Sequence, residues 1–278
     1  MVTFGLDLSH YQALSLNLAQ CRAEGIESVF IKSTEGASFT DSAFATRLRQ
    51  ARAAGLLVAA YHYVRASDPA SAQVAHIAAV VPRDVPVILD VETNSGAIGL
   101  TRDLVDRLRA AGYRVPLLYL PRWYWQQIGS PSLAGLPPLW SSRYPDNRSG
   151  TVSNEYADVP ASYWQGYGGL DVAVLQFTSS ATVAGYSPLD ANAYRGTREQ
   201  LAELLGGTPT PKPHTEEDQM RFVRGDSKLP IPNTNFTWGD VVFKISWPSV
   251  GATAVRTRIV DSADPGYQAA LRTGAGMD

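Results

Sequence analysis

Apolar runs with β-strand character recur along the first half of the chain at a constant spacing. They begin near Val2, Ser28, Leu57, Pro86 and Val115. From the second run onward, the starts are about 29 residues apart. Several runs are continuously apolar, as expected for strands that are covered on both faces. The pattern predicts a parallel sheet built from repeated units.

Helical periodicity fills segments between these runs. Apolar residues fall on one helical face after Asp41, and again after Thr101, which we expect to be the N-cap of its helix. Glycines stand where helices should end: Gly25, Gly55 and Gly112. Strands that alternate with helices at a constant period predict parallel βαβ units.

Two α/β architectures share this pattern, an open doubly wound sheet and a closed barrel. The open sheet usually carries a glycine-rich phosphate loop after a strand, and the chain has neither a G-x-G-x-x-G nor a Walker A sequence. Acidic and aromatic residues follow the strands instead: Asp7, Glu35, Tyr61, His62, Asp90, Glu92 and Tyr119. Since a barrel presents catalytic groups at this end of its strands, we predict a barrel.

The helical spacing fades after residue 130. Short β-like pieces follow at 139–142, 163–165 and 172–178, and a final helix is expected over 197–205. The predicted fold class is therefore α/β, a reduced TIM-like barrel with about five βα units and then strands with little helix.

Composition divides the chain into three parts. We assign 1–206 to the barrel, 207–219 to a linker rich in Pro and Thr, and 220–278 to a small β-rich domain. That last domain holds three β-like runs, at 220–223, 241–247 and 254–260.

Charge and cysteine content exclude several classes of protein. The net charge of −2 and pI of about 6.1 give no general attraction to nucleic acid or to an anionic membrane. Cys21 is the only cysteine, so no internal disulfide can form. The longest near-apolar run, 53–64, is too short to span a bilayer, and the start lacks the pattern of a signal peptide. The four histidines lack zinc-site spacing, and we expect no metal or cofactor. His62 is expected to be a hydrogen-bonded wall residue.

Asp90 and Glu92 follow the predicted strand 85–89 and are separated by one residue. Side chains two apart in a strand point to the same face, so both carboxylates should project into the barrel mouth. Neighbouring carboxylates resist ionising together, which raises one pKa and leaves the other group charged. An acid beside an anion suits glycoside hydrolysis, whose transition state resembles an oxocarbenium ion. The tripeptide alone equally fits two solvated charges bridged to Lys32.

Two further carboxylates join this pair if the barrel closes. Asp7 follows the first strand and Asp190 follows the last strand region, and either alone fits a helix cap or a turn. In a closed barrel these strands are neighbours, so all four carboxylates converge, at a cost in stability that function would explain. Tyr61 and Tyr119 stand at strand ends, where their ring faces suit stacking on sugars.

Six segments, in this order, resemble the glycoside hydrolase family 25 lysozymes, the Chalaropsis-type N-acetylmuramidases. They are GLDLSHYQ from Gly5, FIKSTEG from Phe30, YHY from Tyr61, DVE from Asp90, LQFT from Leu175 and DAN from Asp190. The resemblance covers residues 1–205 and implies a (β/α)5β3 barrel. It also implies hydrolysis of the β-1,4 bond between N-acetylmuramic acid and N-acetylglucosamine in bacterial peptidoglycan.

The resemblance assigns roles to individual residues. Glu92 is the implied general acid, Asp90 is its charged neighbour, and Asp7 and Asp190 orient or activate the remaining partner. The second step stays open between a carboxylate nucleophile and the acetamido group of the substrate. The residues expected to bind substrate are Tyr61, Tyr119, Lys32, Trp140, Gln176 and Tyr11. Leu175 and Ala59 depart from the usual Trp and Gly of the family, which indicates altered pocket walls.

An unexported muramidase with a linker and a second domain resembles a phage endolysin, which stays in the host cytoplasm until lysis and then acts on the cell wall. Residues 220–278 would then bind the wall and raise the local enzyme concentration, or serve as a structural appendage. Two other functions remain open, a glycan-binding pseudoenzyme on the same barrel and a hydrolase of another N-acetylated glycan such as chitin. The retained acids argue against the first, and the absence of a D-x-x-D-x-D-x-E run argues against the second.

Overall fold

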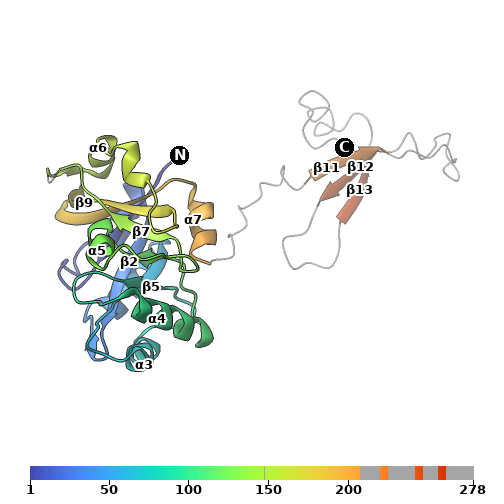
Figure 1. The fold of residues 1–278 in the computed structure, drawn as a ribbon. Helices are drawn as coiled ribbons and strands as arrows, with labels where there is room; N and C mark the ends of the chain where they lie inside the picture. Colours follow the sequence, from blue (N-terminus) through green and yellow to red (C-terminus); the bar gives the residue numbers. More distant parts are fainter. Residues whose placement is uncertain (147, 207–219, 225–241, 247–255, 261–278) are drawn as a thin grey trace, which may run out of the picture. The chain divides into compact units, whose positions relative to one another are not determined.

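The computed structural model describes residues 1–206, apart from residue 147, and three strands of the C-terminal part. The chain divides into two compact units, 1–210 and 211–278 (Figure 1). In the second unit, strands β11 (Met220–Arg224), β12 (Val242–Ser246) and β13 (Arg256–Val260) form an antiparallel sheet. Each of the three predicted β-like runs overlaps one of these strands, and β11 extends one residue beyond its run.

Eight strands close into a barrel in the first unit. They are β1 (Thr3–Leu8), β2 (Ile26–Glu35), β4 (Leu57–Tyr63), β5 (Val87–Asp90), β6 (Leu118–Tyr119), β7 (Leu139–Ser142), β9 (Val172–Val183) and β10 (Tyr186–Tyr194). Neighbouring strands are parallel from β1 round to β9, and β10 is antiparallel to both β9 and β1. Two short strands extend the barrel strands: β3 (Phe39–Thr40) pairs with β2, and β8 (Gly150–Thr151) pairs with β9. The predicted α/β barrel is confirmed.

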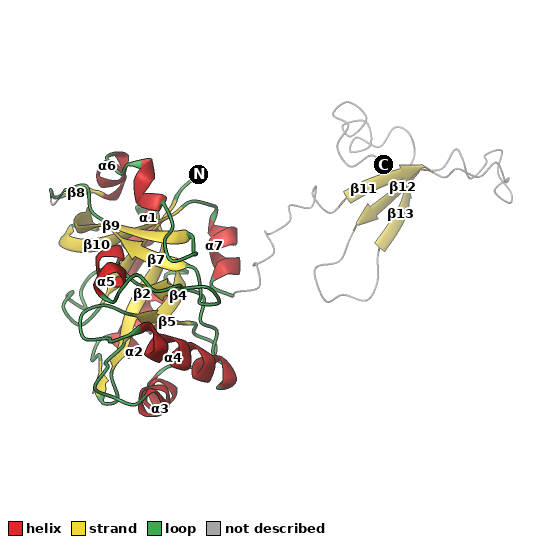
Figure 2. Cartoon of the chain, in the orientation of Figure 1, coloured by secondary structure: helices red, strands yellow, loops and turns green. Residues whose placement is uncertain are grey.

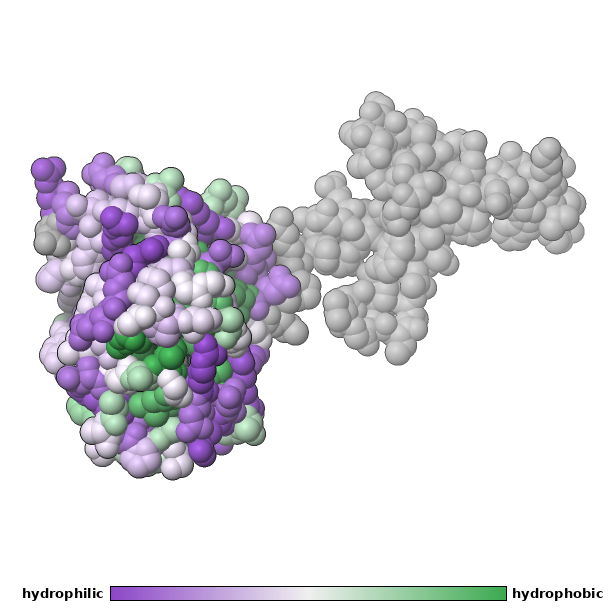
Figure 3. Space-filling view, in the orientation of Figure 1, coloured by the Kyte–Doolittle hydropathy of each residue, from purple (hydrophilic) through white to green (hydrophobic). Residues whose placement is uncertain are grey.

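Helices surround the strands (Figure 2). They are α1 (Leu18–Ala23), α2 (Phe44–Ala53), α3 (Ala70–Val80), α4 (Ile98–Ala110), α5 (Arg122–Gln127), α6 (Val152–Ala157) and α7 (Arg198–Leu204). The first five lie between consecutive parallel strands. On the face drawn in Figure 3, hydrophobic residues gather around α4, where Ile98 and Leu100 are partly buried, and hydrophilic residues surround them. Among the described residues, every helix is too short or too polar to cross a membrane.

The two faces of the strands build two apolar clusters. Residues that alternate along each strand pack either against the helices or into the barrel. The inner cluster contains Phe30, Ala59, Ile88, Leu117, Trp140 and Val174, and Leu201 and Leu205 near the C-terminal end of the unit join it. Since side chains fill the interior, polar groups can collect only at the mouth.

A buried arginine fixes the loop that follows β1. Arg47 of α2 is fully buried and donates hydrogen bonds to the carbonyl oxygens of Gln12, Ala13 and Leu16. These bonds pair both terminal nitrogens of the buried guanidinium with carbonyl oxygens of the loop. The loop therefore leaves β1 in a fixed direction, next to Asp7.

Most predicted helix ends agree with the structure, and two local predictions are wrong. Gly25, Gly55 and Gly112 follow helices with φ of 97°, 70° and 83°. Thr197 caps α7 in a capping box, as the predicted helix 197–205 requires. Thr101 is not an N-cap, because α4 begins at Ile98 and buries Thr101.

The predicted strand at 163–165 is also wrong. A 3₁₀-helix spans Ala161–Trp164, and the N–H of Tyr163 donates to the carbonyl oxygen of Pro160. Proline fixes φ near the helical value, which favours this turn over an extended strand. The predicted strand at 172–178 exists but continues to Val183.

Candidate active site

The barrel closure brings four carboxyl groups together at the mouth. Asp7 near the end of β1 lies opposite Asp190 of β10 in the antiparallel register. Asp90 ends β5, and Glu92 follows two residues later. The charge of Glu92 acts on both Asp7 and Asp90, which places the four groups in one electrostatic cluster. These are the four residues that the sequence predicts to converge.

Burial raises the pKa of every member of this cluster. It raises the pKa of Asp7 to about 8, with a further contribution from the charge of Asp190. Burial raises the pKa of Asp190 to about 6. Burial and the charge of Glu92 hold the pKa of Asp90 well above its usual range. The pKa of Glu92 is raised by burial, although Lys32 and Arg65 oppose the shift. The mouth can therefore hold protons near neutral pH.

Two side-chain amides hold Asp7 in place. Gln176 Nε2 and Asn192 Nδ2 each donate a hydrogen bond of 2.8 Å to Asp7 Oδ2. Their carbonyl oxygens accept from other side chains, Gln176 Oε1 from Tyr144 at 2.7 Å and Asn192 Oδ1 from the indole N–H of Trp140 at 2.7 Å. These bonds orient both NH₂ groups toward Asp7. One oxygen of Asp7 is thus fixed, and its other oxygen remains for chemistry.

The predicted substrate-binding residues have different positions. Gln176 is 5% exposed and Trp140 is 2% exposed, so both act through Asp7 and neither presents a free face to a ligand. Tyr61 and Tyr119 are partly exposed beside Trp140, with ring centroids 6.2 and 4.6 Å from it. Tyr11 is 82% exposed, and its ring lies 4.2 Å from that of His10.

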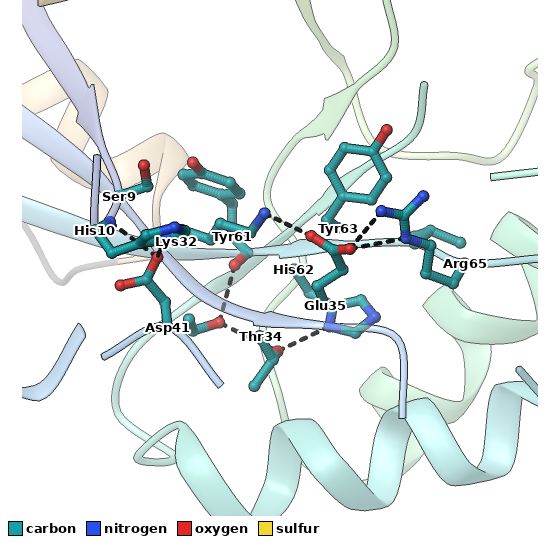
Figure 4. Close-up of polar contacts among 12 residues, drawn as sticks. Ser9, His10, Lys32, Thr34, Glu35, Asp41, Tyr61, His62, Tyr63 and Arg65 are labelled. Atoms are coloured by element: carbon teal, nitrogen blue, oxygen red, sulfur yellow. Dashed lines mark hydrogen bonds and ion pairs between the residues drawn. The ribbon is translucent and has the colours of Figure 1, made fainter. Parts of the chain in front are cut away.

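Glu35 connects two cations next to the carboxyl cluster. Its carboxylate accepts from Lys32 Nζ at 2.7 Å and from Arg65 Nε at 2.8 Å, and Figure 4 shows it between the two side chains. Lys32 Nζ and the Arg65 guanidinium also lie 5.1 and 4.6 Å from the ring centroid of Tyr63. Lys32 therefore pairs with Glu35, and the alternative in which it bridges Asp90 and Glu92 is not the arrangement present.

His62 holds the strand residues around Glu35 and Arg65 through hydrogen bonds to Thr34 and Gln73. Its ring is fully buried, with Nδ1 at 2.7 Å from Thr34 Oγ1 and Nε2 at 3.0 Å from Gln73 Oε1 (Figure 4 shows the Thr34 contact). Burial lowers the pKa of His62 to about 4, so the ring is neutral. Gln73 in turn donates to the carbonyl oxygen of Arg65 at 2.8 Å. The prediction of a hydrogen-bonded wall residue is confirmed.

Sequence reasoning did not assign three of these residues to the site. Asn192 and Glu35 stand in the segments DAN and FIKSTEG, so their signal was visible there. Arg65 stands in no motif, and only the pairing of β2 with β4 brings it to Glu35. Among the described residues, no group of three or more His, Cys, Asp or Glu side chains is arranged to hold a metal ion.

Comparisons with known proteins give a family match and several similar proteins. The family described as "Glycosyl hydrolases family 25" matches residues 6–186. "Lysozyme M1" of Streptomyces globisporus is 26% identical over 225 residues, covering 73% of this chain and 71% of that protein. The "N,O-diacetylmuramidase" of Chalaropsis is also 26% identical, covering 73% of this chain and 99% of that protein. A muramidase structure from Trichobolus zukalii has a TM-score of 0.60 and 27% identity, and the match covers 73% of this chain and 98% of that one. The structure of a lysozyme from Streptomyces coelicolor has a TM-score of 0.59 and 25% identity, and the match covers 74% of this chain and 98% of that one.

Proposed function

Since the chain belongs to glycosyl hydrolase family 25, it is a glycoside hydrolase, and we propose that it is an N-acetylmuramidase. The bond cleaved is the β-1,4 linkage between N-acetylmuramic acid and N-acetylglucosamine in peptidoglycan. One observation carries the proposal, the cluster of four carboxyl groups in which burial raises each pKa. The similar lysozymes and muramidases support the choice of substrate.

Glu92 is suited to act as the general acid. Its side chain is only partly exposed at the mouth, and burial raises its pKa, which favours the protonated form that must deliver a proton to the leaving glycosidic oxygen. The positive charges of Lys32 and Arg65 favour the ionised form of Glu92 and lower its pKa, but Glu35 pairs with both cations. Glu35 thus limits how far they lower the pKa of Glu92.

Asp7 and Asp190 are suited to stabilise positive charge on the sugar. They lie opposite each other, and burial and mutual repulsion favour one shared proton near neutral pH. One negative charge then remains at this pair. It faces the positive charge that develops as the glycosidic bond breaks.

The product of the reaction tests this function. Purified peptidoglycan incubated with the protein should lose turbidity, and the new reducing ends should be N-acetylmuramic acid. Chitin should not be cleaved at a comparable rate, which separates this function from hydrolysis of another N-acetylated glycan. Binding to peptidoglycan without release of reducing ends would instead support a glycan-binding pseudoenzyme.

Replacing Glu35 with Gln tests the electrostatic part of the mechanism. The change leaves the positive charges of Lys32 and Arg65 unopposed, so the pKa of Glu92 should fall. Because Glu92 must be protonated to act, the alkaline limb of the pH–rate profile should move to lower pH. Asp103→Asn is the matched control, since it breaks an exposed 2.7 Å pair with Arg107 away from the site. An alkaline limb that stays at the wild-type pH in the Glu35→Gln variant would contradict this role.

The phage context and the wall-binding role of residues 220–278 stay predictions from the sequence. Their support is the separate C-terminal unit and the Pro- and Thr-rich segment that joins it to the barrel.

A further inference from the structure

A pocket of about 640 Å³ is lined in part by the residues that follow Glu92 in the chain. Its lining includes Arg65, Thr93, Asn94, Gly96, Tyr124 and Gln127. Thr93 and Asn94 directly follow Glu92 in the loop between β5 and α4, so the pocket and the general acid share one segment. A group bound here would be held at a defined place relative to the scissile bond.

Hydrogen bonds fix this shared segment. Ser95 Oγ accepts from the N–H of Glu92 at 3.0 Å and donates to the carbonyl oxygen of Val64 at 2.8 Å. The N–H of Gly96 donates to Tyr124 Oη at 2.9 Å, and the carbonyl oxygen of Asn94 accepts from the N–H of Ala66 at 2.9 Å. A preformed pocket loses little entropy when a ligand binds, so weak polar contacts here can still contribute to affinity.

The polar groups of the lining match a peptide. The side chains of Asn94 and Gln127 are exposed and make no hydrogen bond within the described part of the chain, so each offers an NH₂ donor and a carbonyl acceptor. Arg65 uses Nε and Nη2 for Glu35, and its Nη1 makes no hydrogen bond to any described residue. Side-chain amides complement peptide groups, and a guanidinium complements a carboxylate.

The lining differs from that of a sugar subsite. Sugar rings stack on exposed aromatic faces, whereas the only aromatic residue in this lining, Tyr124, is 3% exposed and directs its hydroxyl to Gly96. The chemistry therefore favours an extended, acidic, amide-rich ligand over another saccharide unit.

We propose that this pocket binds the peptide that peptidoglycan carries on the lactyl group of N-acetylmuramic acid. The inference rests on the proposed muramidase function. The lactyl group is attached to the sugar ring whose C1 loses its bond to the leaving glycosidic oxygen, so the peptide starts on the ring that lies next to the general acid Glu92. Its amide groups pair with Asn94 and Gln127, and a carboxylate pairs with Arg65. The site thus selects glycan strands that carry peptides.

The test compares two forms of one substrate. Soluble, uncrosslinked peptidoglycan strands are divided, and one half is treated with an amidase that removes the peptides. The wild-type kcat/KM should be higher on the peptide-bearing strands by about tenfold, the effect of two ordinary neutral hydrogen bonds. The double variant Asn94→Gly, Gln127→Ala should lose most of this preference, the remainder coming from Arg65. It should keep the wild-type rate on the stripped strands, because glycine tolerates the φ of 69° at Asn94. Gln126→Ala, the neighbour on α5 outside the lining, should keep the preference.

Each other outcome has a defined meaning. Equal wild-type kcat/KM on the two substrates would overturn the peptide site and leave the muramidase function standing. An equal loss by the double variant on both substrates would also overturn it, because the residues would then serve the loop and not the peptide. No cleavage of either substrate by the wild type would overturn the muramidase function, and the peptide site with it.

Discussion

Replacing Glu92 with Gln is expected to lower kcat on peptidoglycan about 10³-fold, within the range that a general acid contributes. The amide has nearly the same shape as the carboxylic acid but cannot give a proton to the leaving oxygen. The residual rate would come from substrate positioning and from the charge at Asp7 and Asp190. Release of N-acetylmuramic acid reducing ends over time measures the effect.

A matched substitution separates chemistry from folding. Glu203→Gln changes an exposed residue of α7 and should leave kcat unchanged. Both variants should unfold at temperatures close to that of the wild type, since neither carboxylate is fully buried. Reducing ends formed at the wild-type rate by the Glu92→Gln variant would refute the assignment of Glu92 as the acid.

The barrel could be predicted because its cause is local and repeated. Each unit needs an apolar strand and a helix that covers it, and the repeated spacing of the strands leaves a regular pattern in the chain. Acidic residues at strand ends then become neighbours once the sheet closes, as Asp7 and Asp190 do. Closure itself follows from the pairing of β1 with both β2 and β10.

The supporting contacts could not be predicted, because they join distant segments by side-chain geometry. The hydrogen bond of Trp140 to Asn192 spans 52 residues. The sequence predicts that Trp140 binds the sugar, but through this bond it orients Asn192 toward Asp7. The pairing of Glu35 with Arg65 likewise depends on the register between β2 and β4. Local errors have a different origin. Thr101 has the residue type of an N-cap, but α4 already begins at Ile98.

Replacing Asp7 with Asn should lower kcat and, above pH 4, raise the free energy of unfolding. The variant should lose at least about 100-fold in kcat, because an amide cannot exchange a proton with Asp190 or become an anion as positive charge develops on the sugar. Its oxygen can still accept both hydrogen bonds that Gln176 and Asn192 donate to Asp7 Oδ2, so the fold should be retained. Reducing-end assays measure the first effect.

The pH dependence of unfolding measures the second effect. The pKa of Asp7 is about 8 in the folded protein and 3.8 for the ordinary group, so between these values the folded state holds a proton that the unfolded chain has lost. The wild type therefore loses stability as pH rises through this window, by about 1.4 kcal/mol per pH unit for one full proton. The amide in the Asp7→Asn variant does not titrate, so the two proteins should have similar free energies of unfolding below pH 4. The variant should become increasingly more stable up to about pH 8, and the difference should then level off. Urea unfolding at pH 4 to 9 tests this, and a constant difference between the two proteins would show that burial of Asp7 does not destabilise the fold.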